Sequence, residues 1–215
     1  MLRVETIVCG PLDVNAYVVS MEGAEECFVV DPAAASEVLQ YLARENLRCT
    51  HILLTHGHFD HIGGVADIKK ETGATICMHA ADADMLTSDA RSMAVLANVR
   101  LKPVSADCVF TEDETFLAAG IKVRALHTPG HTQGCVCYIC EDENILFSGD
   151  TLFRLSVGRA DFPDSNEELL YTSLVEKLFA LQHNYTVYPG HMRSTMLDFE
   201  REHNPFLRAV RGQQW

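Results

Sequence analysis

The sequence predicts an α/β fold with layered helices, on two observations. Short apolar runs that end in polar residues alternate with segments of helical periodicity along the chain. The 215 residues are 47% hydrophobic and 22% charged, which is enough apolar material to build a core. No apolar run reaches the roughly 18 residues that a membrane helix needs. We therefore expect residues 1–215 to form a single domain that does not span a membrane.

Five apolar runs predict strands, and each of them is followed by polar or turn-forming residues. They cover residues 27–30, 51–54, 122–126, 145–147 and 186–188. Three segments between them have the periodicity of helices, over residues 36–45, 62–72 and 166–182. Ser36 and Asn166 stand at the start of two of these segments and are predicted to cap them.

The N-terminal residues lack the long apolar stretch of a secretory signal, so we expect a cytoplasmic protein. In that compartment the eight cysteines are expected to be reduced and to act as small buried hydrophobic residues. The pair Cys137 and Cys140 has the spacing of a metal knuckle but lacks a second pair, which favours a structural role. The net charge of −13 repels phosphate backbones, so nucleic acid is not expected as a partner.

The segment from Thr55 to His61 carries the strongest functional signal. It places His56, His58, Asp60 and His61 within six positions, where a predicted strand gives way to a predicted helix. Imidazole and carboxylate groups are ligands for zinc, iron or manganese. Four donors are too many for one open catalytic site and too few for two closed ones. The segment therefore predicts a metal site that needs further ligands from elsewhere.

Three later residues are the candidates for these further ligands. His131 follows Pro129-Gly130, Asp150 follows Ser148-Gly149 and His191 follows Pro189-Gly190, each after a predicted strand. Strand ends can meet at one edge of a sheet, so we expect these side chains to join the first cluster. Five histidines and two aspartates are enough for two ions if one carboxylate is shared by both.

These motifs resemble those of the metallo-β-lactamase superfamily, and more narrowly those of its hydroxyacylglutathione hydrolase (glyoxalase II) branch. The matching segments are 15–17, 30–32, 55–64, 128–132, 148–153, 158–159, 188–191 and 204–207. The resemblance implies a four-layer αββα sandwich with two divalent metal ions at one edge of the sheets. Zinc is expected first, with iron and manganese as alternatives.

The resemblance also assigns roles to the ligand candidates. His56, His58 and His131 would hold the first ion; Asp60, His61 and His191 would hold the second; and Asp150 would bridge them. Two such ions would make a shared water acidic enough to supply hydroxide near neutral pH, and Asp60 would orient this nucleophile. His127 matches no ligand position and is expected to be structural. Arg159 and Arg154 follow Asp150 and are candidates for binding a substrate carboxylate.

The expected substrate is a small hydroxyacyl thioester such as S-lactoylglutathione. Two features depart from the branch: Met192 replaces the glycine that often follows the last histidine, and 24 residues follow His191. That length implies that the C-terminal helical domain, which binds glutathione in longer relatives, is absent or reduced. We therefore expect weak discrimination for the thiol half of the substrate.

Several other functions use similar ligands. A lactonase, a persulfide dioxygenase and a phosphodiesterase are alternatives within the superfamily, and a di-iron redox module is an alternative outside hydrolysis. Asp60, His61 and His191 favour two metals over the single iron of the dioxygenase. The acidic chain disfavours a nuclease, and the histidine after Asp60 disfavours β-lactamase action. The sequence leaves the acyl group, the native metal and the oligomeric state open.

Overall fold

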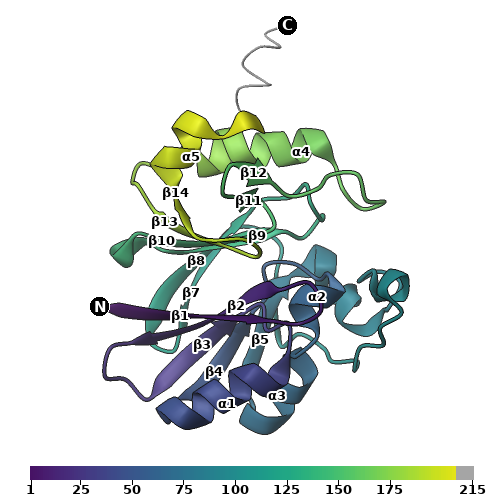
Figure 1. Ribbon diagram of the computed structural model, residues 1–215, viewed down its shortest axis with the longest axis vertical. Helices are drawn as coiled ribbons and strands as arrows, with labels where there is room; N and C mark the ends of the chain where they lie inside the picture. Colours follow the sequence, from purple (N-terminus) through teal and green to yellow (C-terminus); the bar gives the residue numbers. More distant parts are fainter. Residues whose placement is uncertain (207–215) are drawn as a thin grey trace, which may run out of the picture.

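The computed structural model describes residues 1–206, in which two six-stranded β-sheets pack face to face between outer layers of helices (Figure 1). The first sheet has the order β1-β2-β3-β4-β5-β6 and the second has the order β14-β13-β10-β9-β8-β7. Strands β1 to β3 pair antiparallel and β3 to β6 pair parallel. In the second sheet β10 and β13 are parallel, and the other neighbours are antiparallel. This is the α/β sandwich that the sequence predicted.

The strands are two to eight residues long. Those of the first sheet are β1 (Leu2–Cys9), β2 (Val14–Met21), β3 (Glu26–Val30), β4 (Arg48–Leu53), β5 (Thr75–His79) and β6 (Cys108–Phe110). Those of the second are β7 (Glu114–Ala118), β8 (Ile121–His127), β9 (Val136–Cys140), β10 (Ile145–Gly149), β13 (Thr186–Pro189) and β14 (Thr195–Met196). A separate hairpin is formed by β11 (Leu152–Phe153) and β12 (Ser156–Val157).

Helices α1 (Ala35–Glu45) and α3 (Val65–Thr72) lie on the outer face of the first sheet, and α4 (Glu167–Thr172) and α5 (Leu197–His203) lie on the outer face of the second. The short α2 (Phe59–Ile62) lies at one edge of the sandwich. Short 3-10 segments cover η1 (Ala80–Thr87), η2 (Ala94–Ala97) and η3 (Glu141–Glu143), and η4 (Ser173–Leu178) is π-helical. Within residues 1–206, no helix has the length and apolar character needed to cross a membrane.

Three apolar clusters hold the layers together. The first packs α1 and α3 on the first sheet, through residues such as Val38 and Ile68. The second fills the space between the sheets, where the rings of Phe28 and Phe147 meet edge to face at 6.3 Å. The third packs α4 and η4 on the second sheet, with Leu174 at its centre. Burying one such side chain contributes about 1.5–3 kcal/mol, so the sandwich is held mainly by these interfaces.

The predicted helices are present, but their limits differ from the sequence-based expectation. Asn166 caps α4, where its side chain accepts a hydrogen bond from Leu169 N at 3.0 Å. Ser36 does not cap α1, because the helix already begins at Ala35. The segment 166–182 is not one α-helix, since it changes to π-helical geometry at Ser173 and that turn ends at Leu178.

The expected helix over 62–72 is divided between α2 and α3 at Gly63 and Gly64. A Cβ atom on Gly63 would lie 2.4 Å from the carbonyl oxygen of Ala33, and one on Gly64 would lie 2.6 Å from the carbonyl carbon of Ala34. The two glycines therefore let the loop after β3 press directly against the start of α3. This close approach brings the α2 segment, with its histidine cluster, up to the sheet.

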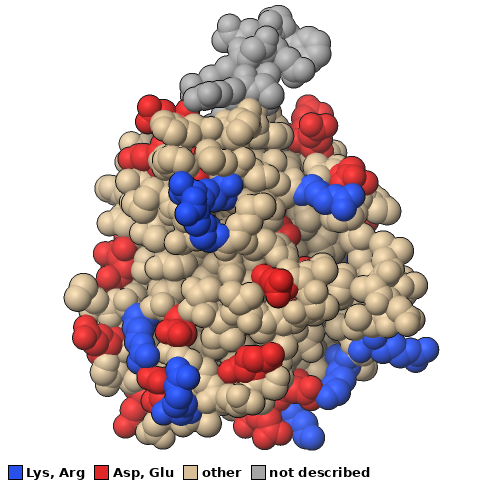
Figure 2. Space-filling view, in the orientation of Figure 1, with Lys and Arg blue, Asp and Glu red and all other residues tan. Residues whose placement is uncertain are grey.

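The remaining features concern cysteines and charge. All eight cysteines are free, and seven of them are buried, as expected for thiols that act as small hydrophobic groups. On the face shown in Figure 2, acidic and basic side chains are interspersed rather than gathered in one field.

Candidate metal centre

The seven predicted ligands lie together at one edge of the sandwich. The loop after β4 carries His56 and His58, and α2 carries Asp60 and His61. The other three follow strands of the second sheet: His131 lies after β8, Asp150 directly after β10 and His191 two residues after the end of β13. The carboxyl ends of strands from both sheets thus supply the donors. Their atoms form groups close enough to hold metal ions.

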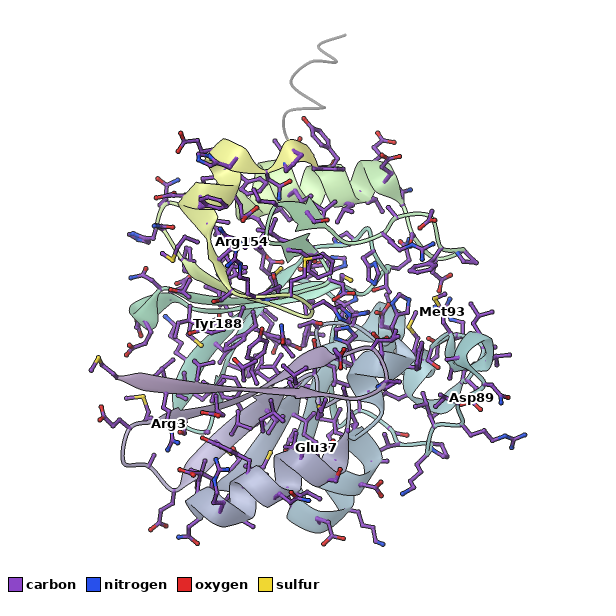
Figure 3. All side chains as sticks on the ribbon, in the orientation of Figure 1. Arg3, Glu37, Asp89, Met93, Arg154 and Tyr188 are labelled. Atoms are coloured by element: carbon purple, nitrogen blue, oxygen red, sulfur yellow. The ribbon has the colours of Figure 1, made fainter. Side chains whose placement is uncertain are left out.

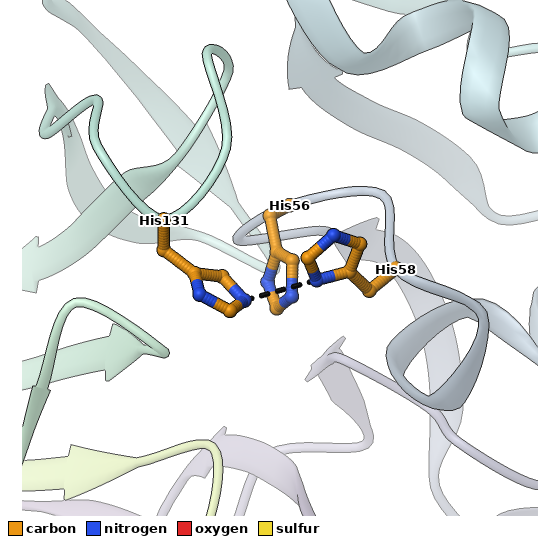
Figure 4. Close-up of side chains that lie close together, drawn as sticks. All are labelled: His56, His58 and His131. Carbon is orange, nitrogen blue, oxygen red and sulfur yellow. Dashed lines mark hydrogen bonds between the residues drawn. The ribbon is translucent and has the colours of Figure 1, made fainter. Parts of the chain in front are cut away.

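The first group is His56, His58 and His131, whose ligand atoms lie within 4.8 Å of one another (Figure 4). Nδ1 of His58 lies 2.9 Å from Nε2 of His131. His56 is fully buried, and its Nε2 has no hydrogen-bond partner among residues 1–206. A buried polar atom without a partner costs about 1–3 kcal/mol. Three imidazole nitrogens that face one another in this way fit a single cation.

The second group is Asp60, His61 and His191. Oδ2 of Asp60 lies 3.4 Å from Nε2 of His191 and 3.7 Å from Nε2 of His61. The ring of His61 is fully buried, whereas His191 is partly open to solvent. One carboxylate and two imidazoles form a donor set that zinc, iron and manganese all accept.

Asp150 lies between the two groups. One oxygen, Oδ2, is 3.6 Å from Nε2 of His131 in the first group and 3.6 Å from Nε2 of His191 in the second. The other oxygen, Oδ1, is 3.3 Å from Nε2 of His61 without the alignment of a hydrogen bond. This carboxylate is therefore placed to be shared by two ions.

The protonation of the histidines fits a cationic occupant. Burial lowers the pKa of His56 well below its usual range, and burial with the neighbouring His131 lowers that of His58 to about 3. Both rings are thus neutral, the form that binds metal. Burial also opposes the charged form of His61, but Asp150 and Asp60 outweigh it and raise the pKa of His61. The carboxylates of Asp60 and Asp150 therefore favour a positive charge at this place.

Asp31 is a site residue to which sequence reasoning assigned no role. Its carboxylate accepts hydrogen bonds from the backbone N and Oγ1 of Thr55 at 2.8 Å and 2.6 Å. It also lies 3.0 Å from Nδ1 of His61. Asp31 thereby fixes the ring orientation of His61 and the start of the ligand loop. The segment Val30-Asp31-Pro32 was noted as a motif, but its partner lies 30 positions away in the sequence.

Asp82 is a second site residue, and the sequence analysis missed it. Its buried carboxylate accepts hydrogen bonds from Gly57 N at 3.1 Å, Thr132 Oγ1 at 2.7 Å and Gly134 N at 2.8 Å. Gly57 lies between His56 and His58, and Thr132 follows His131. Asp82 thus ties together the two loops that carry the first group of ligands.

The motif Asn15-Ala16-Tyr17 holds the loop of His191. The side-chain amide of Asn15 donates to the carbonyl oxygens of Pro189 and Met192 at 3.0 Å and 2.7 Å. The hydroxyl of Tyr17 donates to Pro189 O at 2.6 Å. A strand of the first sheet therefore positions a ligand that follows a strand of the second.

Two glycines beside Asp150, Gly158 and Gly190, are required by close packing and not by a positive φ. A Cβ atom on Gly190 would lie 2.3 Å from Asp150 Oδ1 and 2.6 Å from Cε1 of His61. A Cβ atom on Gly158 would lie 1.8 Å from the carbonyl oxygen of Asp150. The chain thus passes close to the shared carboxylate on two sides.

The two arginines differ in their relation to the site. Arg159 lines the cavity beside the ligands, and it forms two hydrogen bonds to Asp161, at 2.9 Å and 2.8 Å. Arg154, labelled in Figure 3, packs over the ring of Phe199 at 4.5 Å, and it is not among the lining residues.

His127 lies outside both ligand groups. Its ring stacks on that of His79 with centroids 4.0 Å apart, and its Nε2 lies 2.9 Å from the carbonyl oxygen of Gln133. This packing agrees with the structural role expected from the sequence.

Comparison with known proteins agrees with this geometry. The family described as "Metallo-beta-lactamase superfamily" matches residues 9–191. The "Probable metallo-hydrolase YqgX" of Bacillus subtilis is 32% identical over 202 residues, which are 93% of this chain and 95% of the relative. The "Hydroxyacylglutathione hydrolase GloC" of Haemophilus influenzae is 30% identical over 184 residues, which are 84% of this chain and 87% of the relative.

Solved structures have the same fold. The BLEG-1 B3 metallo-beta-lactamase superposes with a TM-score of 0.90 at 33% identity, covering 96% of this chain and 99% of the other. TTHA1623 in a di-iron-bound form superposes with a TM-score of 0.80 at 33% identity, covering 94% and 100%. The chain is thus similar over nearly its whole length to proteins of one superfamily.

Proposed function

We propose that this chain, which belongs to the metallo-beta-lactamase superfamily, is a binuclear metallohydrolase that cleaves acyl thioesters. The observation that carries the proposal is the position of Asp150, whose carboxylate lies between two separate groups of three donors. The similarity to the hydroxyacylglutathione hydrolase GloC suggests S-lactoylglutathione as the reference substrate.

In this proposal His56, His58 and His131 would hold the first ion, Asp60, His61 and His191 would hold the second, and Asp150 would be shared by both. Zinc is the first choice for the metal. Iron is the main alternative, because the similar TTHA1623 is described in a di-iron-bound form.

Two bound divalent ions supply Lewis acidity, which makes a water nucleophilic near neutral pH and stabilises negative charge on the substrate carbonyl oxygen. The buried carboxylate of Asp60 accepts a hydrogen bond from the attacking water and so orients it. A thiolate leaves without prior protonation because thiols are far more acidic than alcohols or amines. The site therefore needs no dedicated general acid for a thioester.

The test is a substrate panel with the metal-loaded protein. It compares S-lactoylglutathione, a lactoyl thioester of a short neutral thiol, a homoserine lactone, a phosphodiester and a β-lactam at equal concentrations. The β-lactam is included because of the similarity to the BLEG-1 enzyme. We expect both thioesters to be hydrolysed faster than the other compounds. Faster turnover of the lactone, the phosphodiester or the β-lactam would reject thioester hydrolysis as the main activity.

Two variants show whether the activity arises at this site. Asp150→Ala removes the shared carboxylate and is expected to abolish turnover together with most of the bound metal. His127→Ala removes a half-buried histidine outside the ligand groups and is expected to retain both. Equal losses in the two variants would show that the ligands are assigned wrongly.

A further inference from the structure

A cavity of about 430 Å³ opens beside the ligand cluster, and its walls are largely apolar. The ring of Phe162 lies 5.6 Å from that of His58, and the ring of Phe153 lies 6.0 Å from that of His191. Apolar walls therefore begin directly at the ligands, on the sides of both donor groups. Leu12 continues the wall toward solvent.

Two methionines of the cavity wall have a backbone conformation that favours glycine. Met93 has a φ of 65° and Met192 has a φ of 68°, and both side chains line the cavity. Met93 lies between η1 and η2 and is labelled in Figure 3, while Met192 follows His191. A side chain with a Cβ atom adopts this conformation only at a cost. The positions thus keep a long flexible apolar group where glycine would be easier to accommodate, which points to a role in binding.

The charged residues around the cavity are already paired. Apart from the histidines, Arg159 is the cationic side chain among the lining residues within 1–206, and it is bound to Asp161 on one side and packed over Phe162 on the other. Arg91 lines the adjoining cavity and pairs with Asp84 and Asp164. The two carboxylates of glutathione would have to break these pairs to find a partner.

We propose that this cavity receives an aliphatic acyl chain of the substrate, with Met93 and Met192 as the side chains that determine chain length. The chain is attached to the carbonyl carbon, so it enters the apolar space that starts at the ligands. Methionine suits this task because its unbranched side chain adapts to chains of different length. The proposal rests on the proposed thioester hydrolysis and specifies its acyl group as longer and less polar than lactoyl.

The first experiment measures binding rather than turnover. Acetate, butanoate, hexanoate and octanoate, the carboxylate products of such thioesters, are titrated calorimetrically into the metal-loaded protein. We expect the dissociation constant to fall about fourfold for each added methylene group until the cavity is filled. The same series of acyl groups on one neutral thiol is expected to show a matching rise in kcat/KM.

Glycine variants test the two methionines without introducing strain. Met93→Gly and Met192→Gly remove the wall while leaving residues that accept the left-handed backbone, so the melting temperature is expected to stay the same or rise. The ratio of octanoate to acetate affinity is expected to fall about tenfold in each variant. Leu155→Gly is the matched control, because Leu155 has a φ of 55°, is 42% exposed and is not among the cavity residues. Its affinity ratio is expected to stay at the wild-type value.

The outcomes separate this proposal from the proposed function. If binding depends on chain length but no thioester is hydrolysed, the thioesterase activity is rejected and the proposal that the cavity binds an acyl chain is supported. Hydrolysis of thioesters with no dependence on chain length in either assay would keep the activity and overturn the acyl cavity. An affinity ratio that is unchanged in both methionine variants would also overturn it.

Discussion

The carboxylate of Asp31 lies 3.0 Å from Nδ1 of His61, a ring that is fully buried. This contact holds the proton on Nδ1 and turns the other ring nitrogen toward Asp60 and Asp150. Asp31 therefore acts on the second donor group through His61, which is itself a ligand candidate. Contacts of this kind commonly set the orientation and basicity of a metal-bound histidine.

Replacement of Asp31 by asparagine is expected to weaken the second metal more than the first. The new side-chain amide offers an N–H group where His61 and Thr55 need an acceptor, so the ring loses its orientation. We expect the affinity for the second ion to fall about 10- to 100-fold. Titration of the metal-free protein with zinc in the presence of a competing chelator measures the affinities for the first and the second ion separately. Asp67→Asn, which changes a surface ion pair with Lys102, is the control. Equal affinities of the two variants for the second ion would contradict the role of Asp31.

Asp82→Asn is expected to weaken the first ion instead. Asp82 accepts three hydrogen bonds from the two loops that carry His56, His58 and His131, and an asparagine side chain cannot accept all of them. We expect a loss of about tenfold or more in affinity for the first ion in the same chelator titration. Thr132→Val removes one of the three bonds and should cause a smaller loss. If Asp82→Asn binds the first ion with the wild-type affinity, the two loops are held by other contacts.

The stacked histidines predict a dependence of stability on pH. Burial lowers the pKa of His127 below its ordinary value of 6.5, and nearby His79 and Lys177 act in the same direction, while the carbonyl oxygen of Gln133 and the carboxylate of Asp113 oppose them. A neutral ring is therefore favoured by folding. Its contribution is complete above the pKa of the unfolded chain and is lost as pH falls through about 6.5 toward the lower pKa of the folded state.

His127→Gln removes the group that titrates and keeps a polar side chain. Urea unfolding of the wild type and of this variant at several pH values between about 5 and 8 measures the effect. We expect the free energy of unfolding of the wild type to decline more steeply toward acid than that of the variant. Parallel pH profiles of the two proteins would contradict a neutral, half-buried His127.

The cluster of ligand candidates could be predicted from the sequence because its signal is local. His56, His58, Asp60 and His61 lie within six positions, and Asp150 and His191 each follow a strand and a glycine. The structure brings all of them together, as expected. The α/β fold could be predicted for a similar reason, since the alternation of strands and helices is visible in short windows.

The supporting residues could not be found in this way. Asp82 belongs to a 3-10 segment, and its partners are 25, 50 and 52 positions away, so no short pattern marks it. The division between α2 and α3 results from the approach of the loop at Ala33, which is also a tertiary contact. The apolar cavity is built from several loops, and the left-handed backbone of Met93 is visible only in three dimensions.

The most direct test of the account is the number of metal ions per chain. The protein is purified without chelator, reconstituted with zinc or iron, freed of excess metal and analysed by inductively coupled plasma mass spectrometry. The two donor groups joined by Asp150 predict about two ions per chain. A reproducible value of about one or less that does not rise on reconstitution would contradict the two-metal site and the proposed function with it.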